Sequence, residues 1–229
     1  MKKSFLGKLL HLSDPTLPIG GYTHSNGLET YVQNQWVYDK KSTNEYVRHN
    51  LWHNLKYNDA VLMKLAYEAT AENDLDALLA LDEECTALKS PKEIRQASQK
   101  LGLRLFKIFG RYTEHVLISE WEKRIKAKSA DSHYCILFGM FACLLDIPLP
   151  EALHGFYYNA AIGMVTNAVK LVPLGQLDGQ DILFELHDDL ETLCDETFEV
   201  ARDLVGLCNI GFDIRCMQHE RLYTRIYIS

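Results

Sequence analysis

The segment "ALHGFYYNAAIGMVTNAV", residues 152–169, carries no formally charged side chain and decides how the rest of the chain folds. It is long enough to be considered as a membrane span. However, four of its polar side chains would be costly in hydrocarbon, namely those of His154, Asn159, Thr166 and Asn167. Its alanines and glycines let neighbouring helices approach closely. The segment therefore predicts a buried central helix, and we expect no membrane association.

Helix-type apolar spacing continues on both sides of this segment. Almost nothing alternates like a strand, and no linker or repeat divides the chain. We therefore expect an all-α fold, a single-domain multi-helix bundle over residues 1–229, with residues 211–229 as a C-terminal tail. The expected helices are residues 5–12, 42–55, 59–71, 75–88, 92–109, 114–126, 133–145, 151–172 and 180–207.

Composition excludes some classes of function. The chain has 24 Lys+Arg against 31 Asp+Glu, a formal net charge of −7, which disfavours nucleic acid as a partner. Its six cysteines form no C-x-x-C pair, and the N-terminal apolar run is broken by polar residues before any cleavage site. We therefore expect reduced thiols and a cytoplasmic location.

The stretch "LPIGGYTHSNGLETYV", residues 17–32, has three interpretations. A phosphate-binding loop is disfavoured because no lysine follows the glycine pair. A nucleophile turn, with Ser25 as nucleophile and His24 as its base, resembles G-x-S-x-G but has Thr23 in place of the first glycine. That substitution could block the strained turn that exposes the hydroxyl.

The third interpretation of this stretch is a rigid corner that leads into a helix. The proline fixes φ, and the glycine pair allows a turn closed to other residues. The run from Asn26 to Glu29 predicts a capping box at the start of the next helix. The residues of this structural motif are Pro18, Gly20, Gly21, Asn26, Gly27 and Glu29.

Two pairs of side chains have the spacing of metal ligands on a helix. His49 and His53 are four residues apart, and Cys216 and His219 are three apart. The general-base glutamate of H-E-x-x-H is absent, and neither pair has an evident third ligand. We therefore expect no structural metal site and no cofactor.

Two further segments carry charged side chains that could contact a partner. Lys170 ends the uncharged helix just before Pro173, where it either complements the helix dipole or faces a partner. The final "HERLYTRIYIS", residues 219–229, is either a last helix or an extended tail. It follows Gly211 and Asp213, which predict a break after the last long helix, and terminal segments are poorly ordered unless docked.

Four blocks of the sequence together resemble the UreF family of urease accessory proteins, an α-helical family that helps to install nickel in urease. They span nearly the whole chain in the expected order: "LSDPTLPIGGYTHSNGLETYV" at 12–32, "EIRQASQKLGLRL" at 93–105, "AVKLVPLGQLDGQ" at 168–180 and "MQHERLYTRIYIS" at 217–229. The first and third blocks are the most specific.

The resemblance implies a non-catalytic platform that dimerises, binds UreD/UreH and recruits the GTPase UreG to apo-urease for GTP-dependent nickel insertion. It implies that Lys170 lies at the face that meets the GTPase, and that Arg221, Tyr223 and Arg225 contact a partner. Arginine and tyrosine are favoured interface anchors. Two alternatives stay open: a serine hydrolase that uses His24 and Ser25, and a nickel-binding protein that uses His49 and His53.

Overall fold

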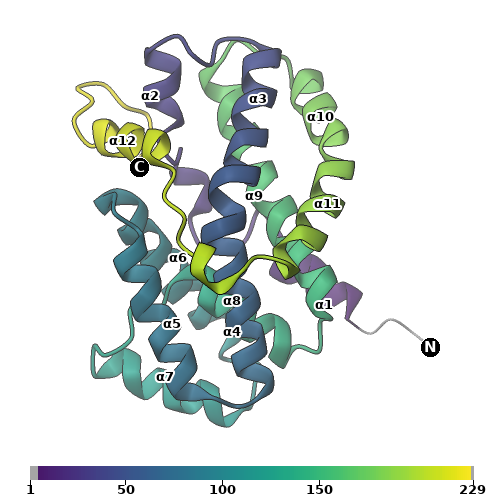
Figure 1. The fold of residues 1–229 in the computed structure, drawn as a ribbon, viewed down its shortest axis with the longest axis vertical. Coiled ribbons are helices and arrows are strands. Elements are labelled where there is room, and N and C mark those ends of the chain that lie inside the picture. The colour runs from purple at the N-terminus through teal and green to yellow at the C-terminus, as the bar shows by residue number, and fades with distance from the viewer. Residues whose placement is uncertain (1–4, 228–229) are drawn as a thin grey trace.

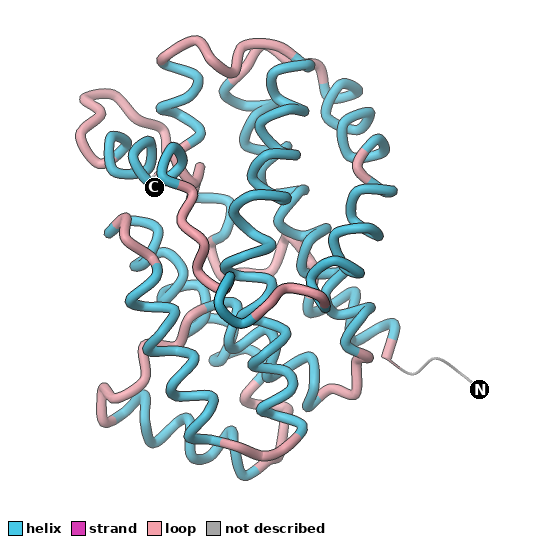
Figure 2. Tube along the Cα trace, in the orientation of Figure 1, coloured by secondary structure: helices cyan, strands magenta, loops and turns pink. Residues whose placement is uncertain are grey.

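The computed structural model describes residues 5–227, and within this range the chain forms helices and connecting turns without a strand (Figure 2). The expectation of a single all-α domain is confirmed. The α-helices are α1 Leu6–Leu12, α2 Leu28–Gln33, α3 Lys40–Asn50, α4 Val61–Ala71, α5 Leu75–Leu88, α6 Lys92–Phe109, α7 Val116–Lys126, α8 Tyr134–Leu144, α9 Leu149–Leu171, α10 Gln176–Glu185, α11 His187–Phe198 and α12 Ile210–His219. Three shorter elements are η1 Gly21–Thr23, η2 Leu51–Ala60 and η3 Arg202–Leu204.

Helix α9 is the central helix of the bundle, as its uncharged sequence predicts. It packs against α1, α2, α3, α4, α8, α10 and α11 (Figure 1). The helix has a proline, Pro150, in its first turn, where a missing N–H costs nothing. It ends at Leu171, and the next residue, Val172, is extended because a proline follows it. Among the described residues, none of the helices combines the length and the apolar character that a membrane crossing needs.

The longest continuous helical stretch differs from expectation. We expected two helices, over residues 42–55 and 59–71, but the chain runs without interruption from α3 through η2 into α4. The ten residues of η2 form a π-helix, and the backbone at both of its junctions stays helical. A π-turn accommodates a change of spacing without a break, which periodicity alone does not reveal. In contrast, the single helix expected over residues 180–207 is divided into α10, α11 and η3.

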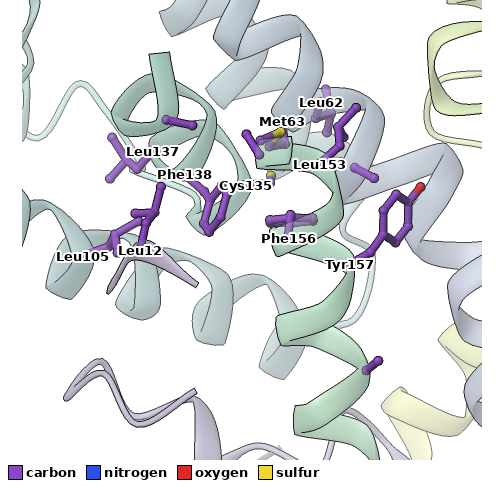
Figure 3. Packing of buried hydrophobic residues seen from close by; sticks show 14 of the residues in the cluster. Leu12, Leu62, Met63, Leu105, Cys135, Leu137, Phe138, Leu153, Phe156 and Tyr157 are labelled. Carbon is purple, nitrogen blue, oxygen red and sulfur yellow. The ribbon is translucent and has the colours of Figure 1, made fainter. Parts of the chain in front are cut away.

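The core extends from α9 into the half of the molecule formed by α4 to α8 (Figure 3). Helix α8 is buried along nearly its whole length and crosses α4 closely. A Cβ atom at Gly139 would overlap the carbonyl oxygen of Met63, so this crossing requires glycine. The same holds at Gly102 of α6, where a Cβ would overlap the carbonyl oxygen of Ser132.

A buried carboxylate organises the loop before α8. Asp82 of α5 is 1% exposed, and it accepts three backbone N–H groups from consecutive residues of the loop. The N···O distances are 2.7 Å from Asp131, 2.8 Å from Ser132 and 2.8 Å from His133. Ser132 has a φ of 65°, in the left-handed region that few residues adopt. The carboxylate therefore holds an irregular loop against α5 and positions the start of α8.

Candidate partner-binding site

The corner before α2 requires glycine at two positions, whereas the expectation that Gly21 is also closed to other residues is wrong, because its φ is not left-handed and a Cβ there meets nothing. Gly20 has a φ of 88° and Gly27 a φ of 80°, both in the left-handed region. Arg104 of α6 donates a hydrogen bond of 2.8 Å to the carbonyl oxygen of Ile19. Asn167 of α9 donates one of 2.7 Å to the carbonyl oxygen of His24. The corner is thus attached to two helices, one of them the central one.

The buried Ser25 does not have the surroundings of a nucleophile. It is 2% exposed, and its hydroxyl has no hydrogen-bond partner among the described residues. A catalytic serine needs a base within hydrogen-bond reach. Burial lowers the pKa of the neighbouring His24, and the positive charges of Lys100 and Arg104 lower it further. The Ser25 hydroxyl is therefore not hydrogen-bonded to His24 in this structure.

The corner provides a first testable prediction. Gly20→Val should destabilise the protein by about 2 kcal/mol, because a β-branched residue is strained at positive φ. Its Cβ would also displace the Arg104 guanidinium from the Ile19 carbonyl. Gly21→Ala is the matched control, since a Cβ there meets nothing within 4 Å. The melting temperature should fall for the first variant only; equal melting temperatures for the two variants would contradict the prediction.

The expectation of a capping box at α2 is wrong. The residue that caps α2 is Gly27, which has no side chain to accept a hydrogen bond. Glu29 is instead 4% exposed and turns toward the C-terminal segment. Its two carboxylate oxygens accept the backbone N–H groups of Ile226, at 2.7 Å, and Tyr227, at 3.1 Å. The Glu29 carboxylate thus links α2 to the C-terminal segment, residues 220–227, which follows α12.

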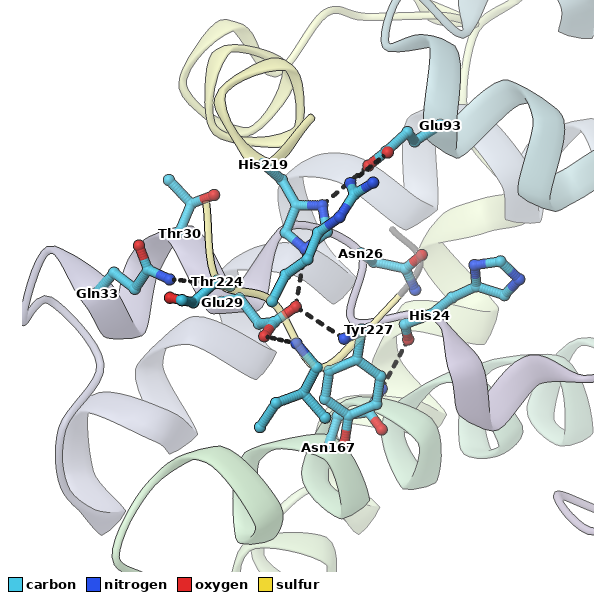
Figure 4. A network of polar contacts seen from close by, with 12 residues as sticks. His24, Asn26, Glu29, Thr30, Gln33, Glu93, Asn167, His219, Thr224 and Tyr227 are labelled. Carbon is cyan, nitrogen blue, oxygen red and sulfur yellow. Dashed lines mark hydrogen bonds and ion pairs between the residues drawn. The ribbon is translucent and has the colours of Figure 1, made fainter. Parts of the chain in front are cut away.

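His219 links this carboxylate to a second one (Figure 4). The side chain is 1% exposed, with Nε2 2.9 Å from Oε2 of Glu29 and Nδ1 2.9 Å from Oε2 of Glu93. Each ring nitrogen of His219 is thus within hydrogen-bond distance of a glutamate oxygen. Arg225 donates to the other oxygen of Glu93 at 2.6 Å. Two glutamate side chains, one imidazole and one guanidinium therefore meet at this site.

We call Glu29, Glu93, His219 and Arg225 the carboxylate clamp. It joins α2, α6, α12 and the C-terminal segment, which are far apart in the sequence. The backbone amides of residues 226 and 227 complete the hydrogen bonding of Glu29. Charge-assisted hydrogen bonds are stronger than neutral ones, and breaking a buried pair is costly. The clamp therefore holds the C-terminal segment on the body of the protein.

The C-terminal segment differs from the expected tail in two ways. Gly211 and Asp213 lie inside α12, because the helix is capped earlier by the Asn209 side chain, so the expected break there is wrong. Beyond α12 the chain is neither a further helix nor detached, and Tyr227 is 6% exposed. Residues 228 and 229 of the expected tail, and residues 1–4 of the expected domain, lie outside the described residues.

The residues expected to contact partners lie near one groove. Arg225 and Leu171 line it, together with side chains of α2 and of the C-terminal segment. Lys170 is exposed in the last turn of α9, next to Leu171. Arg221 is exposed, and Tyr223 projects fully into solvent. The fold thus places the end of α9 and the C-terminal segment side by side, although they are separated in sequence.

The two candidate metal pairs are placed differently. His49 and His53 are exposed on α3 and η2, with ring centroids 5.4 Å apart. Cys216 is buried, its thiol near the carbonyl oxygen of Asn26, and His219 is engaged in the clamp. Over residues 5–227, no group of three or more histidine, cysteine, aspartate and glutamate side chains could hold a metal ion.

Comparisons with known proteins point to one family. A profile of the UreF family matches residues 37–187. A protein of Actinobacillus pleuropneumoniae named urease accessory protein UreF is 50% identical over 98% of this chain and 99% of its own length. Proteins of the same name from Haemophilus influenzae (strain PittGG) and Arthrobacter sp. (strain FB24) are 47% and 32% identical. These alignments cover 98% and 96% of this chain, and 95% and 96% of the two relatives.

Proposed function

The chain belongs to the UreF family of urease accessory proteins, and from that premise we propose that it is a non-catalytic platform for GTP-dependent nickel insertion into apo-urease. In this role it binds UreD/UreH, forms a homodimer and recruits the GTPase UreG. The observation that supports this most is the groove at which the end of α9 meets the clamped C-terminal segment. Arg225 lines the groove, and the exposed Lys170 and Tyr223 are next in sequence to its lining residues Leu171 and Thr224. Arginine and tyrosine side chains are favoured anchors of protein interfaces.

The test of the proposal is reconstitution from purified components. The protein should shift in size on gel filtration with UreD/UreH, and the joint complex should then retain UreG and support activation of apo-urease. GTP hydrolysis measured in the same complex shows whether the GTPase is stimulated, restrained or only aligned. Failure of the protein to retain UreD/UreH or UreG at micromolar concentration would reject the platform role. Light scattering of the protein alone tests the homodimer.

The same preparation tests the two alternative functions. A serine hydrolase would react at Ser25 with a serine-directed phosphonate, and the buried, unpartnered hydroxyl argues against that reaction. A nickel-binding protein would retain nickel through gel filtration, and His49→Ala with His53→Ala would remove it. A platform should show neither behaviour and still bind its partners.

Lys170 is proposed to face the GTPase. Lys170→Ala should leave the fold largely intact, because a lysine at a helix C-terminus contributes only about 0.3–1 kcal/mol through the helix dipole. Retention of UreG and urease activation should fall, while retention of UreD/UreH should not. Lys107→Ala, at an exposed position in the last turn of α6, is the control. Equal activation by the two variants would assign Lys170 to the helix end alone.

Arg225 and Arg221 are proposed as partner contacts of unequal weight. Arg225→Ala should weaken partner retention more than Arg221→Ala, because only Arg225 is both at the groove and in the clamp. Truncation of a buried interface anchor costs about 2 kcal/mol or more, which corresponds to a loss of about 30-fold in affinity. Titration calorimetry with UreD/UreH compares the two. A larger loss for Arg221→Ala would reverse the assignment.

A further inference from the structure

Two buried cysteines outside the partner-binding site face each other across the core. Cys85 of α5 and Cys135 of α8 are both fully buried, and their Sγ atoms are 3.7 Å apart. Both are free thiols. Cys135 lies among packed apolar side chains of the core (Figure 3). A disulfide bond of about 2.05 Å would require these two sulfur atoms to approach further by about 1.7 Å.

The surroundings of the pair shift the pKa values of the two thiols in opposite directions. The hydrogen bond with Cys135 lowers the pKa of the Cys85 thiol, and the positive charge of Lys89 acts in the same direction. Burial raises the pKa of Cys135. Lys89 is held by both carboxylate oxygens of Asp59 at 2.8 Å, and His133 lies on the other side, 2.8 Å from the Thr86 hydroxyl. The surroundings therefore favour the thiolate form at Cys85 over Cys135.

A cavity brings small molecules close to this pair. It has a volume of about 270 Å³ and extends between η2, α6 and α9. Leu88, Lys89 and Asp59 are among the residues that line it, and these residues contact or adjoin the cysteine pair. Hydrogen peroxide is little larger than a water molecule, and the charged side chains of Lys89 and Asp59 are polar groups in an otherwise largely apolar cavity wall.

We propose that Cys85 and Cys135 are a peroxide-reactive pair that forms an intramolecular disulfide. The Cys85 thiolate attacks one peroxide oxygen, the O–O bond breaks, and hydroxide leaves, so that Cys85 becomes a sulfenic acid. Cys135 then attacks the Cys85 sulfur and loses its proton, the S–O bond breaks, and water leaves as the disulfide forms. The two thiols lose two electrons in total, and the peroxide is reduced to two water molecules. Thiol reductants reverse the bond.

The test uses the full chain, reduced and then exposed to hydrogen peroxide. Free thiols are alkylated, and the digest is compared by mass spectrometry with and without later reduction. The expected result is a linked pair of peptides that contain Cys85 and Cys135, formed in preference to any linkage of Cys208, which is exposed. Oxidation of Cys208 or Cys143 while Cys85 and Cys135 stay alkylatable in the denatured protein would overturn the proposal.

Single variants test the order of the two steps. Cys135→Ser should stop the reaction at a sulfenic acid on Cys85, which dimedone traps. Cys85→Ser should leave Cys135 reduced, and Cys85→Ala repeats the test with a side chain that cannot hydrogen-bond. Cys143→Ser is the control and should not alter the linkage. If Cys135 formed a sulfenic acid in either Cys85 variant as fast as Cys85 is oxidised in the wild-type protein, the environment would not activate Cys85.

Discussion

Glu29→Ala is expected to release the C-terminal segment and to abolish retention of UreD/UreH. The substitution removes the acceptor of two backbone N–H groups and leaves the buried His219 beside only one carboxylate. Removing one partner from a buried ion pair costs about 3–5 kcal/mol. Hydrogen exchange should show loss of protection over residues 220–227 with α9 still protected. Pull-down with UreD/UreH then measures the functional loss.

The controls for this prediction separate charge from shape. Glu29→Gln keeps the size of the side chain but has one acceptor oxygen and no charge, so it should give an intermediate loss. Glu45→Ala, an exposed glutamate on α3, should behave as wild type. If Glu29→Ala lost partner binding while residues 220–227 kept full protection, the clamp would not be what presents this segment.

Asp82→Ala is expected to destabilise the whole domain. Three buried N–H groups of the loop at residues 131–133 would lose their acceptor, and each unsatisfied group costs about 1–3 kcal/mol. We expect a loss of about 4 kcal/mol or more in the free energy of unfolding, measured by denaturant titration. The loss is large because the loop positions α8, which forms the centre of the α4 to α8 half.

The matched control is Asp76→Ala on the same helix. Asp76 is exposed in the first turn of α5, where a carboxylate contributes only about 0.3–1 kcal/mol through the helix dipole. Asp82→Asn is a second test, because its amide still offers one acceptor oxygen and should recover part of the loss. Equal unfolding free energies for Asp82→Ala and Asp76→Ala would show that the loop finds other acceptors.

Some features of the site were recognisable before the structure and others were not. Positive φ at Gly20 and Gly27 follows from the local sequence, because glycine adopts that conformation without a steric penalty. Glu93 was missed as a site residue, since one glutamate in an amphipathic helix has no local signature. Glu29 was interpreted as a capping residue because the motif is local, whereas its actual partners are the amides of residues 226 and 227.

The sequence by itself determined the all-α class, the central position of α9 and the family of the protein. Helical periodicity and an uncharged segment depend on neighbouring residues, and motifs are matched residue by residue. Only the tertiary structure decided the continuity of α3, η2 and α4, the proximity of Cys85 to Cys135, and the carboxylate clamp. The last two of these features join distant residues, which in the case of Glu29 and Tyr227 are 198 positions apart. Such pairings arise from packing in three dimensions, which no local pattern encodes.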